Sequence, residues 1–291
     1  MASPLPAFPG LRHAHHDLPT GVRIHVAETG PEDAPPVLCL HGWPQHFLIW
    51  RHLWPVLAGE HRVICPDLRG HGWSGWPDDG DFRKARLADD ALALLDVLGL
   101  ERADVIGHDW GAWTGLLLGF RAPERVRSLL ALSVLHPWQP RPLALRNAWR
   151  FAYQVPLATP WLGERLVRSD GFIQLVIRSG WADRSTWDDG AAASYEAVLR
   201  APVGTRTSHL MYRSFLFGEM AASVGGSFAG ARLPMPARLL IGEHDPLGAA
   251  LAAGFERHGE DAGHEIVPGA GHFLPEERPA VVAERALELL G

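Results

Sequence analysis

The pentapeptide Gly107-His108-Asp109-Trp110-Gly111 constrains the fold of this chain more than any other segment. It follows a strand-like run at residues 103–106 and opens an apolar, helix-like run at residues 112–120. A strand, a sharp turn and a helix, with glycine on both sides of one polar residue, is the pattern of a nucleophile elbow. Serine usually occupies the centre of such an elbow, and here the residue is Asp109.

An aspartate at this position changes the expected chemistry. A carboxylate that attacks a saturated carbon forms an ester, which water can cleave, and carboxylates are established nucleophiles. With a reference pKa of about 3.9, the side chain is ionised at neutral pH without a helper base. Asp109 therefore indicates substitution at an sp3 carbon, with epoxide oxygen or halide leaving. The alternative is that Asp109 only caps the next helix, because aspartate is a favoured N-cap residue.

Composition excludes several classes of protein. The net charge of -6 argues against a nucleic-acid partner, and no apolar run reaches the roughly eighteen residues of a membrane span. The N-terminal segment lacks the pattern of a signal peptide. Cys39 and Cys65 lie in apolar strand-like runs, which indicates buried free thiols in a reducing cytoplasm. No spacing of candidate ligands indicates a metal, and we expect no cofactor.

Strand-like and helix-like runs alternate along most of the chain, which predicts an α/β protein with a mostly parallel sheet flanked by helices. The expected strands lie at 22–26, 36–40, 62–65, 103–106, 128–132, 237–241 and 263–267. The expected helices lie at 48–58, 84–98, 112–120 and 276–290.

The alternation breaks in the middle of the chain, where helical patterns with Pro and Gly interruptions replace it. We therefore expect a core domain made of residues 1–135 and 231–291, with a helical cap at 136–230. Ligands of open α/β sheets bind at the carboxyl ends of the strands, so the cap is a candidate lid over that edge.

Two polar residues follow the last two expected strands, in the chain order nucleophile, acid, histidine. Asp245 follows the first of these strands and His272 the second, so both are expected to face Asp109. His272 would activate water against the ester, and Asp245 would orient His272. Glu243 is the alternative acid, and Asp245 is preferred because the turn-forming Pro246 follows it.

An oxyanion hole on such a scaffold uses two backbone N–H groups, one after the nucleophile and one from an early loop. Trp110 follows the nucleophile, and Trp43 lies in the turn His41-Gly42-Trp43-Pro44 after an early strand. The alternative is that this turn only ends a strand and has no role in an oxyanion hole.

The two turns and the order of the polar residues resemble the α/β-hydrolase superfamily, over residues 22–132 and from 237 to the end. Within it they look most like the epoxide hydrolases, and the related haloalkane dehalogenases share the Asp nucleophile and the following Trp. The resemblance implies an α/β-hydrolase fold with a helical cap. It also implies Asp109 as nucleophile, His272 as base and Asp245 as acid.

Epoxide hydrolases usually carry two lid tyrosines that protonate the epoxide oxygen. Met211-Tyr212-Arg213 resembles the segment of one of them. In the segment that corresponds to the second lid tyrosine, the spacing puts Trp149 where the tyrosine is usual and Tyr153 where phenylalanine is usual. Two alternatives follow: Tyr153 takes the role of the second tyrosine, or the Trp149 N–H donates a hydrogen bond to the epoxide oxygen. Halide leaves without a proton, so Trp110 and Trp149 are its candidate ligands in a dehalogenase. Packing alone is the plainer interpretation of Trp149 and Tyr153.

The sequence thus favours a hydrolase that adds water to a small apolar epoxide, with a haloalkane dehalogenase as the alternative. Trp110 stands where fluoroacetate dehalogenases carry Arg, which disfavours that branch. Asp109 disfavours an ordinary esterase, and the intact set of three polar residues disfavours a non-catalytic receptor.

Overall fold

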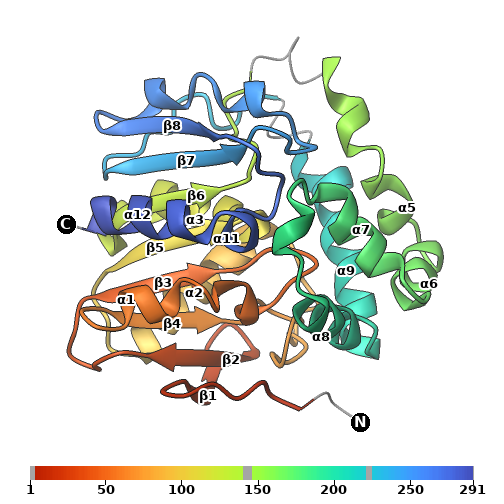
Figure 1. The fold of residues 1–291 in the computed structure, drawn as a ribbon, viewed down its shortest axis with the longest axis horizontal. Helices are drawn as coiled ribbons and strands as arrows, with labels where there is room; N and C mark the ends of the chain where they lie inside the picture. Colours follow the sequence, from red (N-terminus) through yellow and green to blue (C-terminus); the bar gives the residue numbers. More distant parts are fainter. Residues whose placement is uncertain (1–3, 140–145, 221–224, 291) are drawn as a thin grey trace.

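A computed structural model describes residues 4–139, 146–220 and 225–290. Within them, one sheet has the strand order β1-β2-β4-β3-β5-β6-β7-β8 (Figure 1). The strands are β1 (Arg12–Leu18), β2 (Val22–Thr29), β3 (Pro36–Leu40), β4 (Arg62–Pro66), β5 (Ala103–His108), β6 (Val126–Leu132), β7 (Ala237–Gly242) and β8 (Ala262–Val267). β2 pairs with β1 and β4 in antiparallel fashion, and the other neighbours are parallel. The expected mostly parallel sheet is confirmed.

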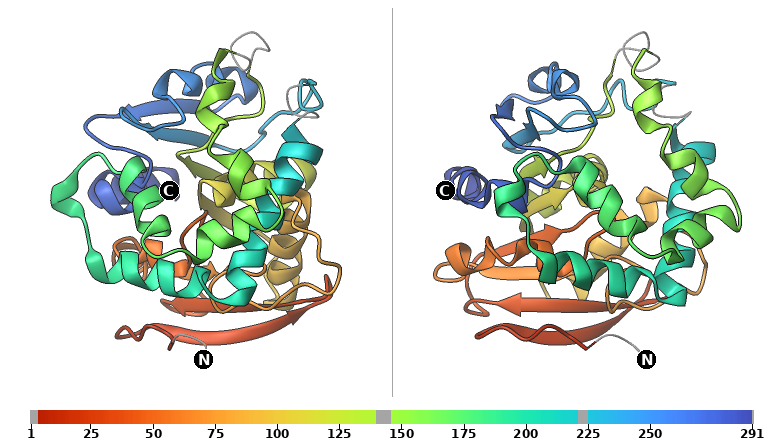
Figure 2. Two further views of the ribbon diagram at one scale, coloured as in Figure 1. Left: turned by 90° about the vertical axis from the view of Figure 1, so that its right-hand side faces the viewer. Right: turned by 45° about the vertical axis from the view of Figure 1, so that its right-hand side comes forward.

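Helices cover both faces of this sheet. α2 (Lys84–Val97) and α3 (Trp110–Arg121) pack together on one face, and α1 (Trp54–Leu57) and α12 (Pro279–Leu290) pack on the other (Figure 2). All residues of β5 are buried, as expected of a central strand between two helical layers. Cys39 and Cys65 are buried free thiols, as the sequence predicted for these two side chains.

Two helices are shorter than the sequence predicted, and proline explains both differences. The expected helix at 48–58 is a 3₁₀ turn (Phe47–Trp50) followed by the short α1, in which Pro55 occupies the first turn. Proline has no N–H to continue an existing helix. The expected helix at 276–290 is divided into α11 (Leu274–Glu277) and α12. Arg278 precedes Pro279 and takes a non-helical φ of -137°, because the residue before proline avoids the helical region.

A layer of helices lies beyond the carboxyl ends of the parallel strands, on the right of Figure 1. The helices of this layer, called the cap helices here for their position beyond the strand ends, are α5 (Gln154–Ala158), α6 (Leu162–Arg168), α7 (Phe172–Gly180), α8 (Asp189–Leu199) and α9 (Pro202–Ser214). α9 packs against α5, α6 and α8, so it is the centre of the layer. Each described helix of the chain is too short or too polar to span a bilayer.

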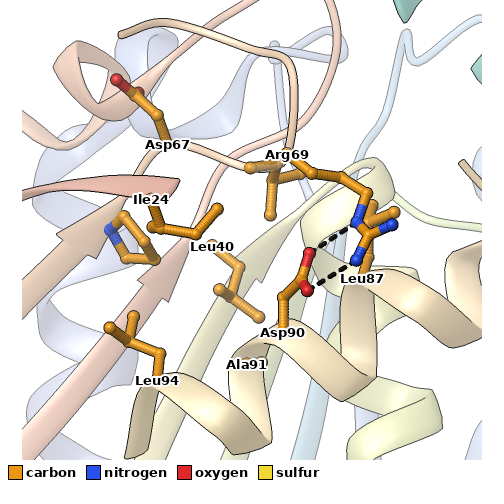
Figure 3. Close-up of a pocket in the computed structure, with 10 residues that line it drawn as sticks. Ile24, Leu40, Asp67, Arg69, Leu87, Asp90, Ala91 and Leu94 are labelled. Carbon is orange, nitrogen blue, oxygen red and sulfur yellow. Dashed lines mark hydrogen bonds and ion pairs between the residues drawn. The ribbon is translucent and has the colours of Figure 1, made fainter. Parts of the chain in front are cut away.

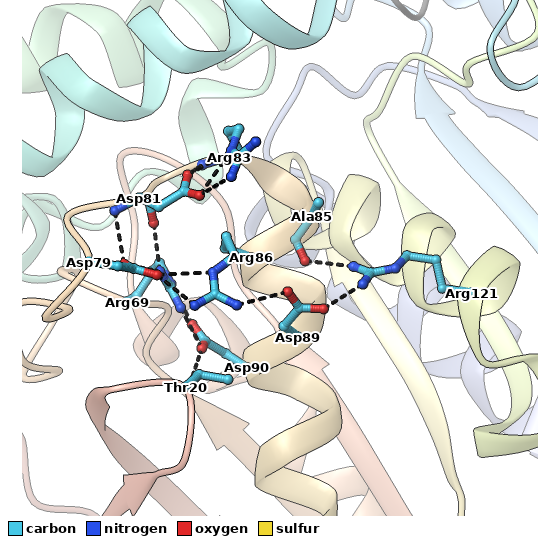
Figure 4. Close-up of polar contacts among 10 residues, drawn as sticks. All are labelled: Thr20, Arg69, Asp79, Asp81, Arg83, Ala85, Arg86, Asp89, Asp90 and Arg121. Atoms are coloured by element: carbon cyan, nitrogen blue, oxygen red, sulfur yellow. Dashed lines mark hydrogen bonds and ion pairs between the residues drawn. The ribbon is translucent and has the colours of Figure 1, made fainter.

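The loop after β4 is anchored to α2 by a buried ion pair. Nε and Nη2 of Arg69 each donate to a carboxylate oxygen of Asp90 at 2.6 Å, beside a small pocket with a mainly apolar lining (Figure 3). Arg69 Nη1 also donates to Asp79 and to the Asp81 carbonyl, within a wider network of arginines and aspartates (Figure 4). A bidentate pair of this kind fixes the orientation of both groups.

The same loop reaches the cap helices at Gly70. A Cβ added there would lie 2.2 Å from Oγ1 of Thr207 in α9, so only glycine fits. The Arg69 network therefore holds a core loop against the helix that carries Tyr212.

Candidate active site

Asp109 occupies a strained turn between β5 and α3. Its φ of 52° and ψ of -117° lie in a region that residues with a side chain rarely adopt, as is common at functional sites. Its side chain makes no capping hydrogen bond to α3, which does not support the helix-cap interpretation. Glycine is required beside it, because a Cβ on Gly111 would lie 2.0 Å from the Leu40 carbonyl oxygen.

The turn after β3 meets Asp109. The backbone N–H of Trp43 donates to Asp109 Oδ1 at 2.9 Å, and the Trp43 indole N–H donates to Ser208 of α9 at 2.9 Å. Trp110, the other expected donor, is the first residue of α3 and adjoins Asp109 in the chain. Of these two backbone donors, Trp43 is the one that hydrogen-bonds the carboxylate.

His272 lies between two carboxylates. Its Nε2 is 3.6 Å from Asp109 Oδ2, and its Nδ1 is 3.2 and 3.1 Å from the two oxygens of Asp245. Burial by itself would lower the pKa of His272, but the negative charges of Asp245 and Asp109 outweigh it and raise the pKa to about 10. The imidazole is therefore protonated in this arrangement at neutral pH.

Asp245 is buried and accepts a further hydrogen bond from the Leu247 N–H at 2.8 Å. Burial raises its pKa, but the charge and hydrogen bonds of His272 more than offset this, so the pKa lies below its usual value. Glu243, the alternative acid, is 53% exposed and accepts from the Gly269 N–H instead. The structure thus brings Asp245, and not Glu243, to His272.

Tyr212 and Tyr153 approach the same carboxylate from the cap side. The buried Tyr212 ring packs edge-on against Trp43 and Trp110, with centroids 5.2 and 5.8 Å away, and Tyr153 lies 6.2 Å from it. Burial, with the Tyr153 hydroxyl and Asp109 nearby, raises the pKa of Tyr212 well above its usual value. Although 43% of Tyr153 is exposed, its hydroxyl is enclosed, and burial raises its pKa to about 12. Both hydroxyls keep their protons at neutral pH.

Trp149 lies away from this cluster. It is 68% exposed, and its ring packs against the Arg150 guanidinium at 4.8 Å. The interpretation of Trp149 as a hydrogen-bond donor to oxygen or halide is therefore not supported. Trp149 lies within a 3₁₀ turn (Ala148–Phe151), and Tyr153 follows that turn. Counting residues along the sequence does not reveal which side of such a turn faces the strands.

Lys84, the only lysine of the chain, is a neighbour that the sequence analysis did not connect to the site. It is fully buried, its Nζ lies 4.4 Å from the Trp110 ring centroid, and it donates to the Met211 carbonyl at 2.6 Å. Burial lowers its pKa to about 8, against the opposing effect of Glu219. The available signal in the sequence was that the chain has a single lysine, Lys84. Composition alone does not tell where in the fold that lysine lies.

His108 and Glu277 are two more contacts that sequence reasoning missed. His108, within the elbow itself, has Nε2 2.8 Å from the His272 carbonyl oxygen, and burial lowers its pKa to about 4. Glu277 accepts from N–H groups on both sides of His272. Among the described residues no group of three or more His, Cys, Asp or Glu side chains has the arrangement of a metal site.

Comparison with known proteins gives consistent results. A family model described as alpha/beta hydrolase fold matches residues 35–279. Epoxide hydrolase A of Mycobacterium tuberculosis (strain ATCC 25618 / H37Rv) is 30% identical, over 93% of this chain and 94% of its own length. Fluoroacetate dehalogenase of Burkholderia sp is 39% identical over 105 residues, which is 35% of this chain and 34% of that protein. The solved structure of epoxide hydrolase CorEH without ligand superimposes with a TM-score of 0.81 and 27% identity, covering 96% of this chain and 98% of CorEH.

Proposed function

Because this chain belongs to the α/β-hydrolase fold family and is an enzyme of that fold, we propose that it is an epoxide hydrolase, which converts a small apolar epoxide and water into a diol. The observation that carries the proposal is one carboxylate, Asp109, with His272 at 3.6 Å and two protonated tyrosines, Tyr153 and Tyr212, near enough for its charge to act on them. The relatives named as epoxide hydrolases support the same substrate class.

In the first half-reaction, Asp109 attacks one ring carbon of the epoxide and the carbon–oxygen bond breaks. Oδ1 is held by the Trp43 N–H, so Oδ2 is the attacking atom. The departing alkoxide is strongly basic and takes a proton from Tyr212 or Tyr153, which leaves a hydroxy ester and a tyrosinate. The tyrosinate recovers a proton from the His272 imidazolium, directly or through solvent.

Forming the ester also prepares the base. Esterification removes the charge of Asp109, one of the two carboxylates that raise the pKa of His272. Neutral His272 then takes a proton from water, and the hydroxide adds to the ester carbonyl, whose oxygen rests at the Trp43 and Trp110 N–H groups. Collapse releases the diol and restores ionised Asp109 and protonated His272. The cycle consumes one water and releases no net proton.

We also propose that residues 136–230 form a cap over a core made of residues 1–135 and 231–291. Support comes from the cap helices beyond the carboxyl ends of the strands (Figure 1) and from the origin of Tyr153 and Tyr212 in this segment. A cap that excludes water strengthens the electrostatic interactions beneath it and protects the ester from solvent.

A dehalogenase is the second candidate, and one observation favours it. The indole N–H of Trp110 is buried and acts on the Tyr212 hydroxyl, but it makes no hydrogen bond of ordinary geometry to a described residue. Such a donor beside Asp109 suits a leaving halide.

The deciding experiment offers the protein styrene oxide and, separately, 1,2-dibromoethane, and measures diol and bromide. His272→Gln should retain an ester on Asp109, visible as an increase in intact mass equal to the substrate after styrene oxide. Asp109→Asn should show neither product nor mass increase. Bromide without diol would replace the proposal by the second candidate, and no product with no ester in His272→Gln would refute both.

A further inference from the structure

Glu277, in the short helix α11, is buried and accepts hydrogen bonds from four backbone N–H groups. Two of them flank the histidine: Gly271 N–H is 3.1 and 3.2 Å from the two carboxylate oxygens, and Phe273 N–H is 3.2 Å from Oε1. The other two belong to the segment after α7, where Ala182 and Asp183 donate to Oε2 at 2.8 and 2.9 Å.

The segment at residues 180–183 and the loop at residues 271–273 are thereby joined edge to edge. His272 N–H donates to the Gly180 carbonyl at 2.7 Å, which adds a direct bond between the two segments. A Cβ on Gly271 would lie 2.1 Å from the same carbonyl oxygen, so the approach leaves no space for a side chain. One carboxylate therefore bridges the histidine loop and the cap-side segment.

A carboxylate suits this position for a chemical reason. Ionised, it offers acceptor sites only, enough for four N–H donors. An amide of the same size offers one oxygen and an NH2 group, which would face N–H donors and leave some of them unsatisfied in a buried place. Among the described residues, the hydrogen-bond donors to the Glu277 carboxylate are these backbone N–H groups and not a side-chain cation, so its acceptor oxygens serve the surrounding backbone.

We propose that Glu277 is a positioning residue for the hydrolytic half-reaction, which holds the His272 loop in register with the cap-side segment. The inference rests on the proposed function for its catalytic consequence. His272 must stay aligned with both Asp245 and the water that attacks the ester, whereas attack by Asp109 on the substrate does not use His272 as a base. Removing the Glu277 carboxylate should therefore slow ester hydrolysis more than ester formation.

Glu276 is a matched control one residue away. It is also buried in α11 and also joins core to cap, but its partners are the side chains of Arg51 and Tyr195. Its variant Glu276→Gln disturbs the same helix and the same boundary between core and cap without touching the backbone N–H groups beside His272.

The test compares Glu277→Gln, Glu277→Asp and Glu276→Gln in single-turnover reactions with styrene oxide. Glu277→Gln should slow ester hydrolysis by about a hundredfold, the effect that a misplacement of about 1 Å can have. Ester formation should change little, so the ester accumulates in the intact mass. Glu277→Asp keeps the charge and should also slow ester hydrolysis more than ester formation, but to a smaller degree. This variant preserves the test if the Gln variant does not fold. Glu276→Gln should not accumulate ester.

A second readout does not depend on the substrate. The pKa of His272, followed by NMR of the imidazole, should fall in the Glu277 variants because the ring drifts from the Asp245 and Asp109 carboxylates, and should hold in Glu276→Gln. An unchanged His272 pKa with unchanged ester hydrolysis would overturn the inference. Absence of an ester in His272→Gln would instead overturn the proposed function, and the imidazole pKa would still decide the role of Glu277.

Discussion

The backbone N–H of Trp43 donates a hydrogen bond of 2.9 Å to Oδ1 of Asp109, across 66 residues of sequence. The contact exists because Gly42 lets the turn after β3 pass directly over the nucleophile: a Cβ there would lie 2.4 Å from the Asp109 Cβ. It leaves Oδ2 free on the side of His272. One backbone bond thus separates the roles of the two carboxylate oxygens.

Gly42→Ala should lower kcat by about a hundredfold, the usual effect of losing one oxyanion donor, because the added methyl forces the Trp43 N–H away from Asp109. Diol formation from styrene oxide measures it. Gly59→Ala is the control, since nothing lies within 4 Å of a Cβ added there. Equal rates for the two variants would remove the Trp43 N–H from the mechanism.

Tyr212→Phe should lower diol formation by about a hundredfold or more, the range of a lost general acid, because the alkoxide then leaves without its proton donor. Release of bromide from 1,2-dibromoethane, if it occurs, should change much less, since bromide needs no proton. Tyr153→Phe should act in the same direction, and the double variant should show whether the hydroxyls substitute for one another. A similar loss on both substrates would contradict the acid role.

Trp149→Phe should leave diol formation and any bromide release within about twofold of the parent, because the exposed Trp149 ring packs on Arg150. Trp110→Phe should weaken any bromide release, since it removes a buried indole N–H that makes no hydrogen bond of ordinary geometry to a described residue. Parallel rate measurements on the two variants check this. A large loss in Trp149→Phe would return that residue to the list of halide ligands.

Stability should fall as the pH drops from about 6.5 toward 4. Burial lowers the pKa of several histidines to about 4, or to about 3 for one of them: His41, His46, His71, His108 and His136. The unfolded chain binds these protons below pH 6.5 and the folded chain does not, so each group favours unfolding in this window, by about 1.4 kcal/mol per pKa unit. His272 has the opposite sign, since its raised pKa stabilises the folded state until the pH passes about 10.

Urea unfolding at pH 7.5, 6 and 5 measures this pH dependence. The urea concentration at the midpoint should decrease as the pH is lowered, while the dependence of the unfolding free energy on urea concentration stays constant. A midpoint that does not move between pH 7.5 and 5 would show that these histidines titrate normally in the folded protein.

Asp90→Asn should destabilise the protein by about 3–5 kcal/mol, because it leaves the Arg69 guanidinium buried without its bidentate partner. Urea unfolding at neutral pH gives the value. Asp96→Asn is the matched control: it breaks an ion pair with Arg125 in which the aspartate is 63% exposed, so the change should stay within about 1 kcal/mol. Equal losses of unfolding free energy in the two variants would mean that the buried Arg69–Asp90 pair contributes no more to stability than an exposed ion pair.

Local patterns carried much of the fold and part of the site. The elbow around Asp109 was predictable because strand, turn and helix are adjacent in sequence, and glycine marks the places where the backbone comes too close for a side chain. Asp245 and His272 follow parallel strands, and the carboxyl ends of such strands meet at one edge. Their distances of 3.1 and 3.2 Å agree with that reasoning.

By itself, then, the sequence determined the mostly parallel sheet, the turn that presents Asp109 and the order of the polar residues after the strands, because each depends on neighbours in the chain. The tertiary structure decided that Tyr153 and not Trp149 joins Tyr212, and that Glu277 bonds the loop of His272. Those contacts depend on how a short 3₁₀ turn, α9 and the segment after α7 pack on the sheet. Packing joins residues that are distant in the chain, and no local pattern encodes which side of a turn will face the strands.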